Sequence, residues 1–379
     1  MILDIRKQFF FNSDVTFLNH GSFGACPRPV FEDYQYWQKK LEQQPVLFST
    51  ETVYRQLKES RIALGKFLGC NDDDLVFFQN PTAAVSNIIF SLDLEPDDEI
   101  LMSNHEYGAL VRAWSKWGQR NHVKIIQKEI PLPVSNHKDF TENFWSGVTD
   151  HTKAIFLSQI TSATALEFPV KTICELAQEK GILTIIDGAH VPGQMDLNIN
   201  ELGCDIYTGA CHKWLCAPKG TSFLYVKKEH QSWVRPLIYS WGKEGDDPDP
   251  SEFLQDFQWQ GTRDMAAFLT LPKVIQFYNE NILLERSNCR KLIRMTEAEL
   301  CDLYNTPSIF QSDEWTHQMV SHLLPKNTPD DIKIKLWEDY KIEVPVFKFN
   351  GQKYIRVSAN IYNNSQQIEY LLNALRSLI

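Results

Sequence analysis

Three stretches of the sequence put polar residues where chemistry could occur, and the first contains Asn80, Thr82 and Ala83. These residues lie in "FFQNPTAAV" (77–85), where an apolar run gives way to a helical pattern. Backbone N–H groups without partners at the start of a helix bind anions such as phosphate, and small residues let the anion approach. An ordinary N-terminal cap by Asn80 or Thr82 explains the same letters, so this stretch alone does not decide between the two.

The second stretch, "TIIDGAH" (184–190), places Asp187 at the end of a very apolar run and His190 three residues later. A buried carboxylate is costly unless it meets a positive partner, and a protonated ring nitrogen of a cofactor is such a partner. A structural aspartate that caps the following turn is the alternative interpretation.

The third stretch, "YTGACHKWLCAPKG" (207–220), places Lys213 among small residues and directly after His212. A lysine that forms a Schiff base needs burial or nearby cations to lower its pKa, and His212 and Lys219 could supply the charge. An ordinary surface lysine and a metal site are the alternatives. The possible metal ligands make no C-x-x-C pair, which structural zinc sites usually show, so the sequence predicts no metal site. These ligands are Cys204, Cys211, His212 and Cys216.

Together the three stretches are far more specific than any one of them. A phosphate-binding turn, then Asp187 at a strand end, then Lys213 after the next strand is the set that pyridoxal phosphate requires. The turn anchors the phosphate, the carboxylate keeps the ring nitrogen protonated, and the lysine binds the aldehyde. Neither G-x-G-x-x-G nor G-x-x-x-x-G-K-[ST] occurs in the sequence, which argues against the usual dinucleotide and nucleotide sites.

Short β-branched segments that alternate with helical patterns must position these residues. Helices are predicted between the segments, at 81–93 and at 170–181, and the second ends on the glycine expected after a helix. Strands separated by helices indicate a mostly parallel α/β sheet, whose active site lies outside the carboxyl ends of the strands. The predicted strands are 74–80, 98–104, 123–130, 153–160, 181–189, 205–210 and 221–228.

The pattern changes in the last third of the chain. A long helical stretch covers 264–304, and an N-G turn between two alternating segments in 340–362 predicts a β-hairpin. The last segment, 365–379, has the pattern of an amphipathic helix. We therefore expect a large α/β domain at 15–265 and a smaller α+β domain formed by 266–379 together with 1–14.

The composition is ordinary for a globular protein of 379 residues, with 43% hydrophobic and 23% charged residues. A net charge of −10 gives no support to nucleic-acid binding and argues against an anionic membrane surface. The first residues do not resemble a signal peptide, and no run approaches the roughly 18 apolar residues of a membrane span. Eight cysteines without a paired framework indicate reduced thiols. We therefore expect a cytoplasmic protein with a small-molecule substrate, and no nucleic-acid or membrane partner.

The sequence resembles the fold-type I pyridoxal-phosphate enzymes of the class V aminotransferase family, and within them the isopenicillin N epimerase-like branch. This resemblance runs from residue 17 to residue 363, and the Asp-Gly-Ala-His and Cys-His-Lys-Trp-Leu motifs are its strongest parts. It implies an α/β fold with a large, mostly parallel-sheet domain, a smaller α+β C-terminal domain, and pyridoxal 5'-phosphate as cofactor. The matching stretches are "FLNHGSFGACPRPV", "SNHEYGALVRAW", "LSQITSATALEFPV", "DGAHVPGQMDL", "YTGACHKWLCAPKG", "WQGTRD" and "EVPVFKFNGQKYIRVSANIYN".

The resemblance also implies a role for each residue around the cofactor. Lys213 would bond to the cofactor aldehyde and act as the catalytic base, Asp187 would pair with the pyridine nitrogen, and His190 would lie near the phenolic oxygen. Tyr107 would stack on the pyridine ring, and Gln159 would lie beside the cofactor. Phosphate contacts are implied for Asn80, Thr82, Ala83 and His212, and for Thr262 from the other subunit of a homodimer.

For the substrate, the resemblance implies that Arg356 binds the α-carboxylate, and that Asn19 and His20 line the mouth of the site. Cysteine desulfurases of the wider group use a nucleophilic cysteine on a loop of the C-terminal domain. Here Cys289 and Cys301 both lie in a helical pattern, so persulfide chemistry of that kind is not expected.

The sequence leaves the reaction open. An epimerase or racemase acting on an amino acid, or on a substrate that contains one, is the first hypothesis. A C–S lyase acting on a cysteine-derived substrate is the second, and an aminotransferase is the third. A catalytically silent binding protein of the same fold is disfavoured because Lys213, Asp187 and Arg356 are all present.

Overall fold

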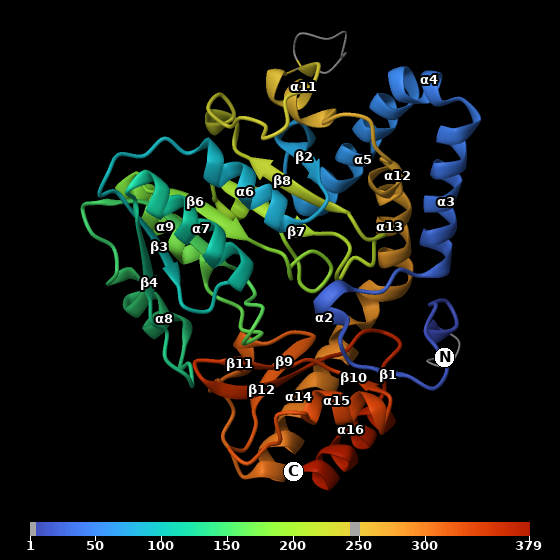
Figure 1. Ribbon diagram of the computed structural model, residues 1–379, viewed down its shortest axis with the longest axis vertical. Helices are drawn as coiled ribbons and strands as arrows, with labels where there is room; N and C mark the ends of the chain where they lie inside the picture. Colours follow the sequence, from blue (N-terminus) through green and yellow to red (C-terminus); the bar gives the residue numbers. More distant parts are fainter. Residues whose placement is uncertain (1–4, 243–250) are drawn as a thin grey trace.

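A seven-stranded sheet forms the centre of the large domain in the computed structural model, which describes residues 5–242 and 251–379 (Figure 1). The strand order is β2-β8-β7-β6-β5-β3-β4, and β8 is antiparallel to both of its neighbours. The other described strands of this sheet run parallel, and each of the seven predicted strand segments is confirmed. The strands are β2 (Leu75–Phe78), β3 (Glu99–Ser103), β4 (Lys124–Lys128), β5 (Thr152–Ser158), β6 (Leu183–Asp187), β7 (Ile206–Ala210) and β8 (Ser222–Val226).

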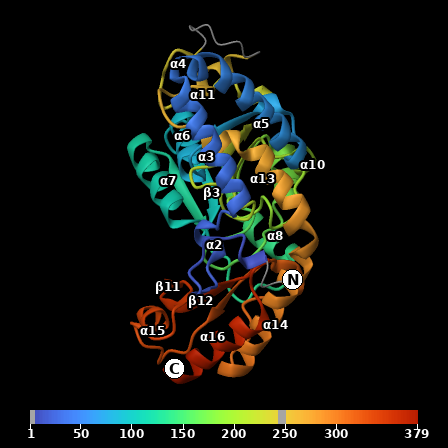
Figure 2. The same ribbon diagram turned by 90° about the vertical axis from the view of Figure 1, so that its right-hand side faces the viewer.

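Helices cover both faces of this sheet because successive side chains of a strand point to opposite faces. On β2, Val76 and Phe78 pack into one apolar core, whereas Leu75 and Phe77 pack into the other. The first core is closed by α6 (Pro81–Ser91), α7 (Gly108–Asn121) and α11 (Glu252–Gln258). The second is closed by α3 (Arg28–Gln43), α5 (Val53–Leu68), α8 (His137–Trp145), α9 (Val170–Lys180) and α13 (Leu271–Phe277). Figure 2 shows α7 and α13 on opposite sides of the molecule.

The two helices predicted from the sequence between strands are confirmed as α6 and α9. The side chain of Asn80 accepts a hydrogen bond from the Ala83 N–H at 2.9 Å, which caps the start of α6. Gly181 closes α9 in the left-handed conformation, with a φ of 66°. None of the described helices has the length and apolar character needed to cross a membrane.

The small domain is built on a three-stranded antiparallel sheet of order β11-β12-β9 (Figure 1). Its strands are β9 (Met319–Leu323), β11 (Val346–Phe349) and β12 (Gln352–Ser358). The predicted hairpin is confirmed, since Asn350 and Gly351 link β11 to β12 with φ values of 46° and 76°, as a tight two-residue turn requires. Helices α14 (Arg286–Tyr304), α15 (Ile332–Glu338) and α16 (Ser365–Leu378) complete its core.

Elements close to the two expected domain boundaries make contacts across them. Both α12 (Ala266–Leu269) and α13 contact α3 and α5 of the large domain, so the chain enters the small domain only at α14. The predicted helical stretch over 264–304 is divided in the same region: Pro272 lies at the start of α13, and π-helical and 3₁₀ turns over 278–285 join α13 to α14. At the other end of the chain, β1 (Thr16–Phe17) pairs with β10 (Ile342–Glu343). The N-terminal segment that contacts the small domain therefore extends past residue 14, the limit expected from the sequence. Residues 1–4 of that prediction lie outside the described residues.

Candidate active site

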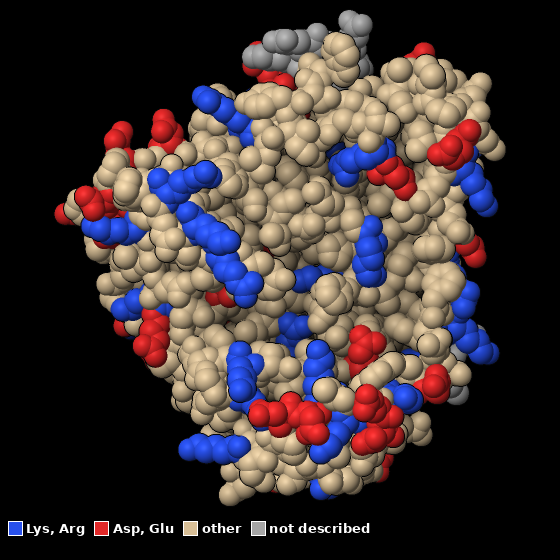
Figure 3. Space-filling model, in the orientation of Figure 1, with Lys and Arg blue, Asp and Glu red and all other residues tan. Residues whose placement is uncertain are grey.

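A cavity of about 890 Å³ opens where the parallel strands of the large domain end. Its walls come from the turns after β2, β3, β5, β6 and β7, from the short helix α2 (His20–Phe23) and from β12 of the small domain. The carboxyl edge of a parallel sheet is the usual place for a ligand site. Figure 3 shows basic side chains (blue) around and within the hollow in the middle of this face, which favours an anionic ligand.

Lys213 enters the cavity from the turn after β7, and its Nζ lies 3.1 Å from Nε2 of His190. The indole N–H of Trp214 donates to Nδ1 of the same ring at 3.3 Å, so the ring proton of a neutral His190 sits on Nε2. Nε2 then donates to the lone pair of an uncharged lysine amine. Burial lowers the pKa of Lys213 to about 8, and burial also holds the pKa of His190 well below 6.5. The site thus favours the nucleophilic form of the lysine.

Asp187 is the last residue of β6, and its buried carboxylate lines the same cavity. Burial raises the pKa of this carboxyl, while the N–H of Ala189, which donates to it at 2.9 Å, and the charge of Lys213 act in the opposite direction. A cationic ring nitrogen in the cavity would stabilise the ionised carboxylate further.

The start of α6 offers the cavity Asn80, Pro81 and Thr82. The Ala83 N–H is already bonded to the side chain of Asn80, and Ala83 does not line the cavity. The cap interpretation is therefore correct for Asn80, and the phosphate contact expected from Ala83 is not available while this cap is formed. Thr82, which does line the cavity, is the remaining phosphate candidate on this turn.

Two aromatic rings predicted to contact the cofactor do lie at the cavity wall. Tyr107 precedes α7 and leaves 47% of its surface exposed, so its ring can be covered by a flat ligand. His212 is buried, and the Thr221 carbonyl 3.0 Å from Nδ1 assigns the ring proton to Nδ1. Burial lowers the pKa of His212 to about 4, so Nε2 is an acceptor at neutral pH.

Arg356 reaches the cavity from β12, on the side opposite the strand ends. It is 6% exposed, and it donates to the Ser162 carbonyl and, at 3.0 Å, to the Ser22 hydroxyl. Its buried Nε has no hydrogen-bond partner among the described residues. Burial lowers the pKa of this guanidinium to about 10, so it is still charged at neutral pH. A carboxylate in the cavity would meet an already positioned cation.

Gln159, predicted to lie beside the cofactor, is not among the residues that line the cavity. Ser158 and Ile160 are, and because side chains alternate along an extended segment, Gln159 turns to the opposite side. There its amide oxygen accepts from the Tyr207 hydroxyl at 2.7 Å.

Asn19 and His20 are not at the mouth of the site either. Asn19 bonds to Ser22 and does not line the cavity, whereas Gly21, Ser22 and Phe23 of α2 do. His20 is fully buried behind the lysine turn, where its Nε2 lies 3.0 Å from the Lys213 carbonyl and its Nδ1 lies 2.5 Å from the Tyr362 hydroxyl.

Gly24, the residue after α2, packs against the turn that carries Lys213. A Cβ atom at this position would lie 2.1 Å from the His212 carbonyl oxygen, and its φ of 68° also favours glycine. Together His20 and Gly24 fix the backbone that carries Lys213 from behind.

The remaining predicted positions lie away from this cavity. Thr262 is exposed between α11 and α12 and does not line the cavity of its own chain. The cysteine and histidine residues considered as metal ligands near Lys213 do not gather into a ligand group within the described residues. These are Cys204, Cys211, His212 and Cys216.

The family model for class-V aminotransferases matches residues 29–371. The chain belongs to this family. Isopenicillin N epimerase from Streptomyces clavuligerus is 30% identical over 99% of this chain and 98% of its own. An L-cysteine desulfhydrase from Arabidopsis thaliana is 25% identical over 99% of this chain and 90% of its own. The family prediction is confirmed, and with it the expectation of a pyridoxal phosphate enzyme.

Solved structures confirm the predicted fold. A mutant of C-DES, with glycine covalently linked to its PLP cofactor, superposes with a TM-score of 0.85 at 18% identity, over 99% of both chains. A cysteine desulfurase from Thermococcus onnurineus superposes with a TM-score of 0.82 at 20% identity, over 100% of this chain and 98% of its own.

The residues of the class-V aminotransferase cavity fit pyridoxal phosphate. The lowered pKa of Lys213 makes its amine readier to react with an aldehyde, the buried carboxylate of Asp187 suits a protonated ring nitrogen, and Tyr107 offers a ring face. The buried Nε of Arg356 has no hydrogen-bond partner among the described residues, so this charged side chain can bind a second anionic group.

Sequence reasoning missed several residues of this site. Ser22, Phe23, Ser158 and Ser162 line the cavity, and so does Lys219, which the sequence suggested only as a charge near Lys213. Lys219 stands six positions after Lys213, and Ser158 ends a predicted strand, so both could have been found from their positions.

Glu106 was also missed, although it precedes Tyr107. Its buried carboxylate accepts from the hydroxyls of Ser103 and Ser158, and burial raises its pKa to about 7. No motif pointed to it, because its partners come from two different strands.

Proposed function

We propose that this chain is an epimerase or racemase that uses pyridoxal phosphate to remove and return the α-proton of an amino-acid substrate. The observation that carries the proposal is the placement of Lys213, whose pKa is lowered to about 8, in a cavity that also holds the buried cation Arg356. The full-length relationship to isopenicillin N epimerases at 30% identity supports this choice among the reactions of the family.

The cofactor would be held by groups that already surround the cavity. Asp187 would pair with the ring nitrogen, Tyr107 would cover one ring face, and the Thr82 hydroxyl would donate to the phosphate. Lys219 adds a further positive charge to the same cavity. Bound pyridoxal phosphate supplies an electron sink that stabilises negative charge at the substrate α-carbon.

The chain's own residues would bind the substrate and move its proton. Arg356 would bind the α-carboxylate through its planar guanidinium, which Ser22 and Ser162 hold in place. Lys213 would take and return the α-proton, a task that suits an amine with a pKa of about 8. His190 would orient the lone pair of the lysine nitrogen, 3.1 Å away, by donating a hydrogen bond from Nε2.

A C–S lyase acting on a cysteine-derived substrate is the second candidate, because several plant relatives are L-cysteine desulfhydrases. The two cysteines of the small domain, Cys289 and Cys301, lie on α14, and neither lines the cavity. A lyase would therefore eliminate the substrate's sulfur group without an enzyme-bound persulfide at these positions. An aminotransferase reaction is the third candidate, supported by the family alone.

We further propose that two chains form a homodimer in which the exposed Thr262 of one chain contributes to the phosphate site of the other, and that the protein is cytoplasmic. Gel filtration should give twice the chain mass, and Thr262→Ala should weaken cofactor binding while leaving that mass unchanged. Elution at the mass of one chain would contradict the dimer.

A product screen in deuterated water separates the candidate reactions. The cofactor-loaded enzyme is incubated with amino acids, cysteine conjugates and small peptides, and products are analysed by mass spectrometry. Deuterium at the α-carbon without release of pyruvate, ammonia or sulfide supports the epimerase, whereas release of these products from a cysteine conjugate identifies the lyase. Turnover that requires a keto acid identifies the aminotransferase.

Two variants control this screen. Lys213→Ala should abolish exchange and the yellow colour, whereas Arg356→Ala should keep the colour and raise the KM. A wild-type protein that stays colourless after incubation with the cofactor would overturn the proposal and favour a silent binding protein.

A further inference from the structure

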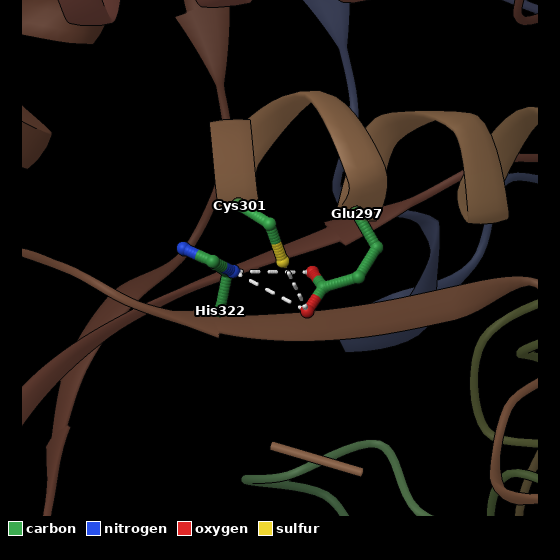
Figure 4. A group of neighbouring side chains, drawn as sticks. All are labelled: Glu297, Cys301 and His322. Carbon is green, nitrogen blue, oxygen red and sulfur yellow. Dashed lines mark hydrogen bonds and ion pairs between the residues drawn. The ribbon is translucent and has the colours of Figure 1, made fainter. Parts of the chain in front are cut away.

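A second group of chemically reactive side chains lies in the small domain, and none of its members lines the cavity. Glu297 and Cys301 stand one turn apart on α14, and His322 lies on β9, which packs against that helix. Figure 4 shows the carboxylate, the thiol and the imidazole converging between the helix and the strand.

The distances between these groups match those around a tetrahedral metal ion. Nδ1 of His322 lies 3.3 Å from both carboxylate oxygens of Glu297, and Sγ of Cys301 lies 3.8 Å from Oε1. With Zn–N and Zn–O bonds of about 2.0 Å and a Zn–S bond of about 2.3 Å, neighbouring ligand atoms are about 3.3–3.5 Å apart. The three donor atoms therefore need to move little to share one ion.

A carboxylate oxygen in this group lacks a partner that a cation would supply. Glu297 is 5% exposed, and its Oε2 accepts no hydrogen bond from a described residue, although Nδ1 of His322 lies 3.3 Å from it. Leaving a buried carboxylate oxygen without a donor is unfavourable. A positive ion bound between Glu297 and His322 would remove that cost.

The surroundings of His322 resemble the outer shell of a metal site. Its Nε2 lies 2.9 Å from the Thr306 hydroxyl, which fixes the ring with Nδ1 directed toward Glu297. The backbone N–H of Thr306 in turn donates to the Cys301 carbonyl at 3.2 Å. A hydrogen bond on the second ring nitrogen is the usual support of a ligating histidine.

We propose that Glu297, Cys301 and His322 bind one zinc ion, with water as the fourth ligand. A thiolate, an imidazole and a carboxylate suit zinc, whereas magnesium and calcium prefer oxygen ligands alone. His322 is fully buried, and the half-buried Cys301 gives the ion and the water an approach from solvent. The sequence predicted no metal site because these ligands lie on a helix and a distant strand.

Such an ion would fasten α14 to the sheet that carries the substrate-binding arginine. His322 pairs with Ile355 across β9 and β12, and Arg356 follows Ile355 directly. The zinc site is thus a structural support for β12 and takes no part in the reaction itself.

Zinc titration of the cofactor-loaded protein tests this proposal. Protein stripped of metal by a chelator is titrated with zinc chloride, the stoichiometry is measured by mass spectrometry of the metal, and the affinity by competition with a coloured chelator. We expect one zinc per chain. Cys301→Ala should weaken binding more than 100-fold, and Thr306→Val should weaken it by about tenfold. Cys289→Ser, which changes another thiol of α14, should leave the affinity unchanged.

Cobalt provides a second measurement that reports the geometry of the site. Co²⁺ in place of zinc should give the intense visible absorption of a tetrahedral thiolate site, at longer wavelengths than the cofactor, and Cys301→Ala should lose it. Circular dichroism verifies that each variant is folded. A chain that binds no zinc, or a folded Cys301→Ala variant that binds it as tightly as the wild type, overturns the proposal.

Discussion

The buried amine of Lys213 should destabilise the cofactor-free protein at neutral pH. Burial lowers its pKa from 10.5 to about 8, so the unfolded chain holds the lysine proton more tightly than the folded chain does. At about 1.4 kcal/mol per pH unit, this difference corresponds to roughly 3 kcal/mol of unfolding free energy. The full cost applies below about pH 8 and disappears as the pH rises to about 10.5, where the unfolded chain also loses its proton.

Replacing this lysine by methionine removes the charge and keeps a similar side-chain length. Cofactor-free Lys213→Met should therefore gain stability over the wild type, and the gain should be roughly 3 kcal/mol larger at about pH 7 than at about pH 10.5. Contributions from packing and from the lost contact with His190 are the same at both pH values. They change the stability difference between the two proteins by the same amount at every pH and leave its pH dependence unchanged.

Urea unfolding of both proteins at several pH values measures this difference, with tryptophan fluorescence and circular dichroism followed at the same protein concentration. Lys138→Met serves as the matched control, because the side chain of Lys138 is 82% exposed and its replacement should show no such slope. A stability difference between Lys213→Met and the wild type that does not change with pH would refute the reasoning.

Three further perturbations test the site. Asp187→Asn removes the only carboxylate that lines the cavity in the described residues, and should weaken cofactor binding by at least about tenfold in a spectrophotometric titration. Arg356→Lys keeps the charge but loses the two-pronged donor, so the KM should rise about 10- to 100-fold while the cofactor absorption is unchanged. Gly24→Ala forces a Cβ atom against the His212 carbonyl oxygen, and should cost on the order of 2–3 kcal/mol in urea unfolding; an unchanged midpoint would contradict the packing described for this turn.

The sequence predicted the sheet well because its strands are buried on both faces. Segments such as Leu75–Phe78 and Ser222–Val226 are buried throughout, and only apolar runs tolerate that position. Asp187, the last residue of β6, and Lys213, in the turn after β7, were found for a related reason. Parallel strands all end at the same edge of the sheet, where a ligand site is expected.

The placement of a side chain was hardest to predict where it depends on one residue along a strand or on one helix cap. Gln159 and Ser158 are neighbours in sequence, but the alternation of an extended chain turns them to opposite sides. Ala83 has the small side chain that a phosphate site favours, yet Asn80 occupies its N–H. His20 stands near two pocket residues in sequence, but packing against Tyr362 keeps it behind the lysine turn. Contacts of this kind depend on segments that no local pattern joins.

The histidine behind the lysine turn also bears on the order in which the protein is made. His20, Lys213 and Tyr362 are far apart in the sequence. The imidazole ring of His20 contacts the other two, the Lys213 carbonyl through Nε2 and the Tyr362 hydroxyl through Nδ1. Chains emerge from the ribosome beginning with the N-terminus, so the central sheet can form while Tyr362 has not yet been synthesised. The support for the lysine is complete only once Tyr362 has been synthesised. A chain released before Tyr362 would carry His20 and Lys213 without the hydroxyl that bonds to Nδ1 of His20.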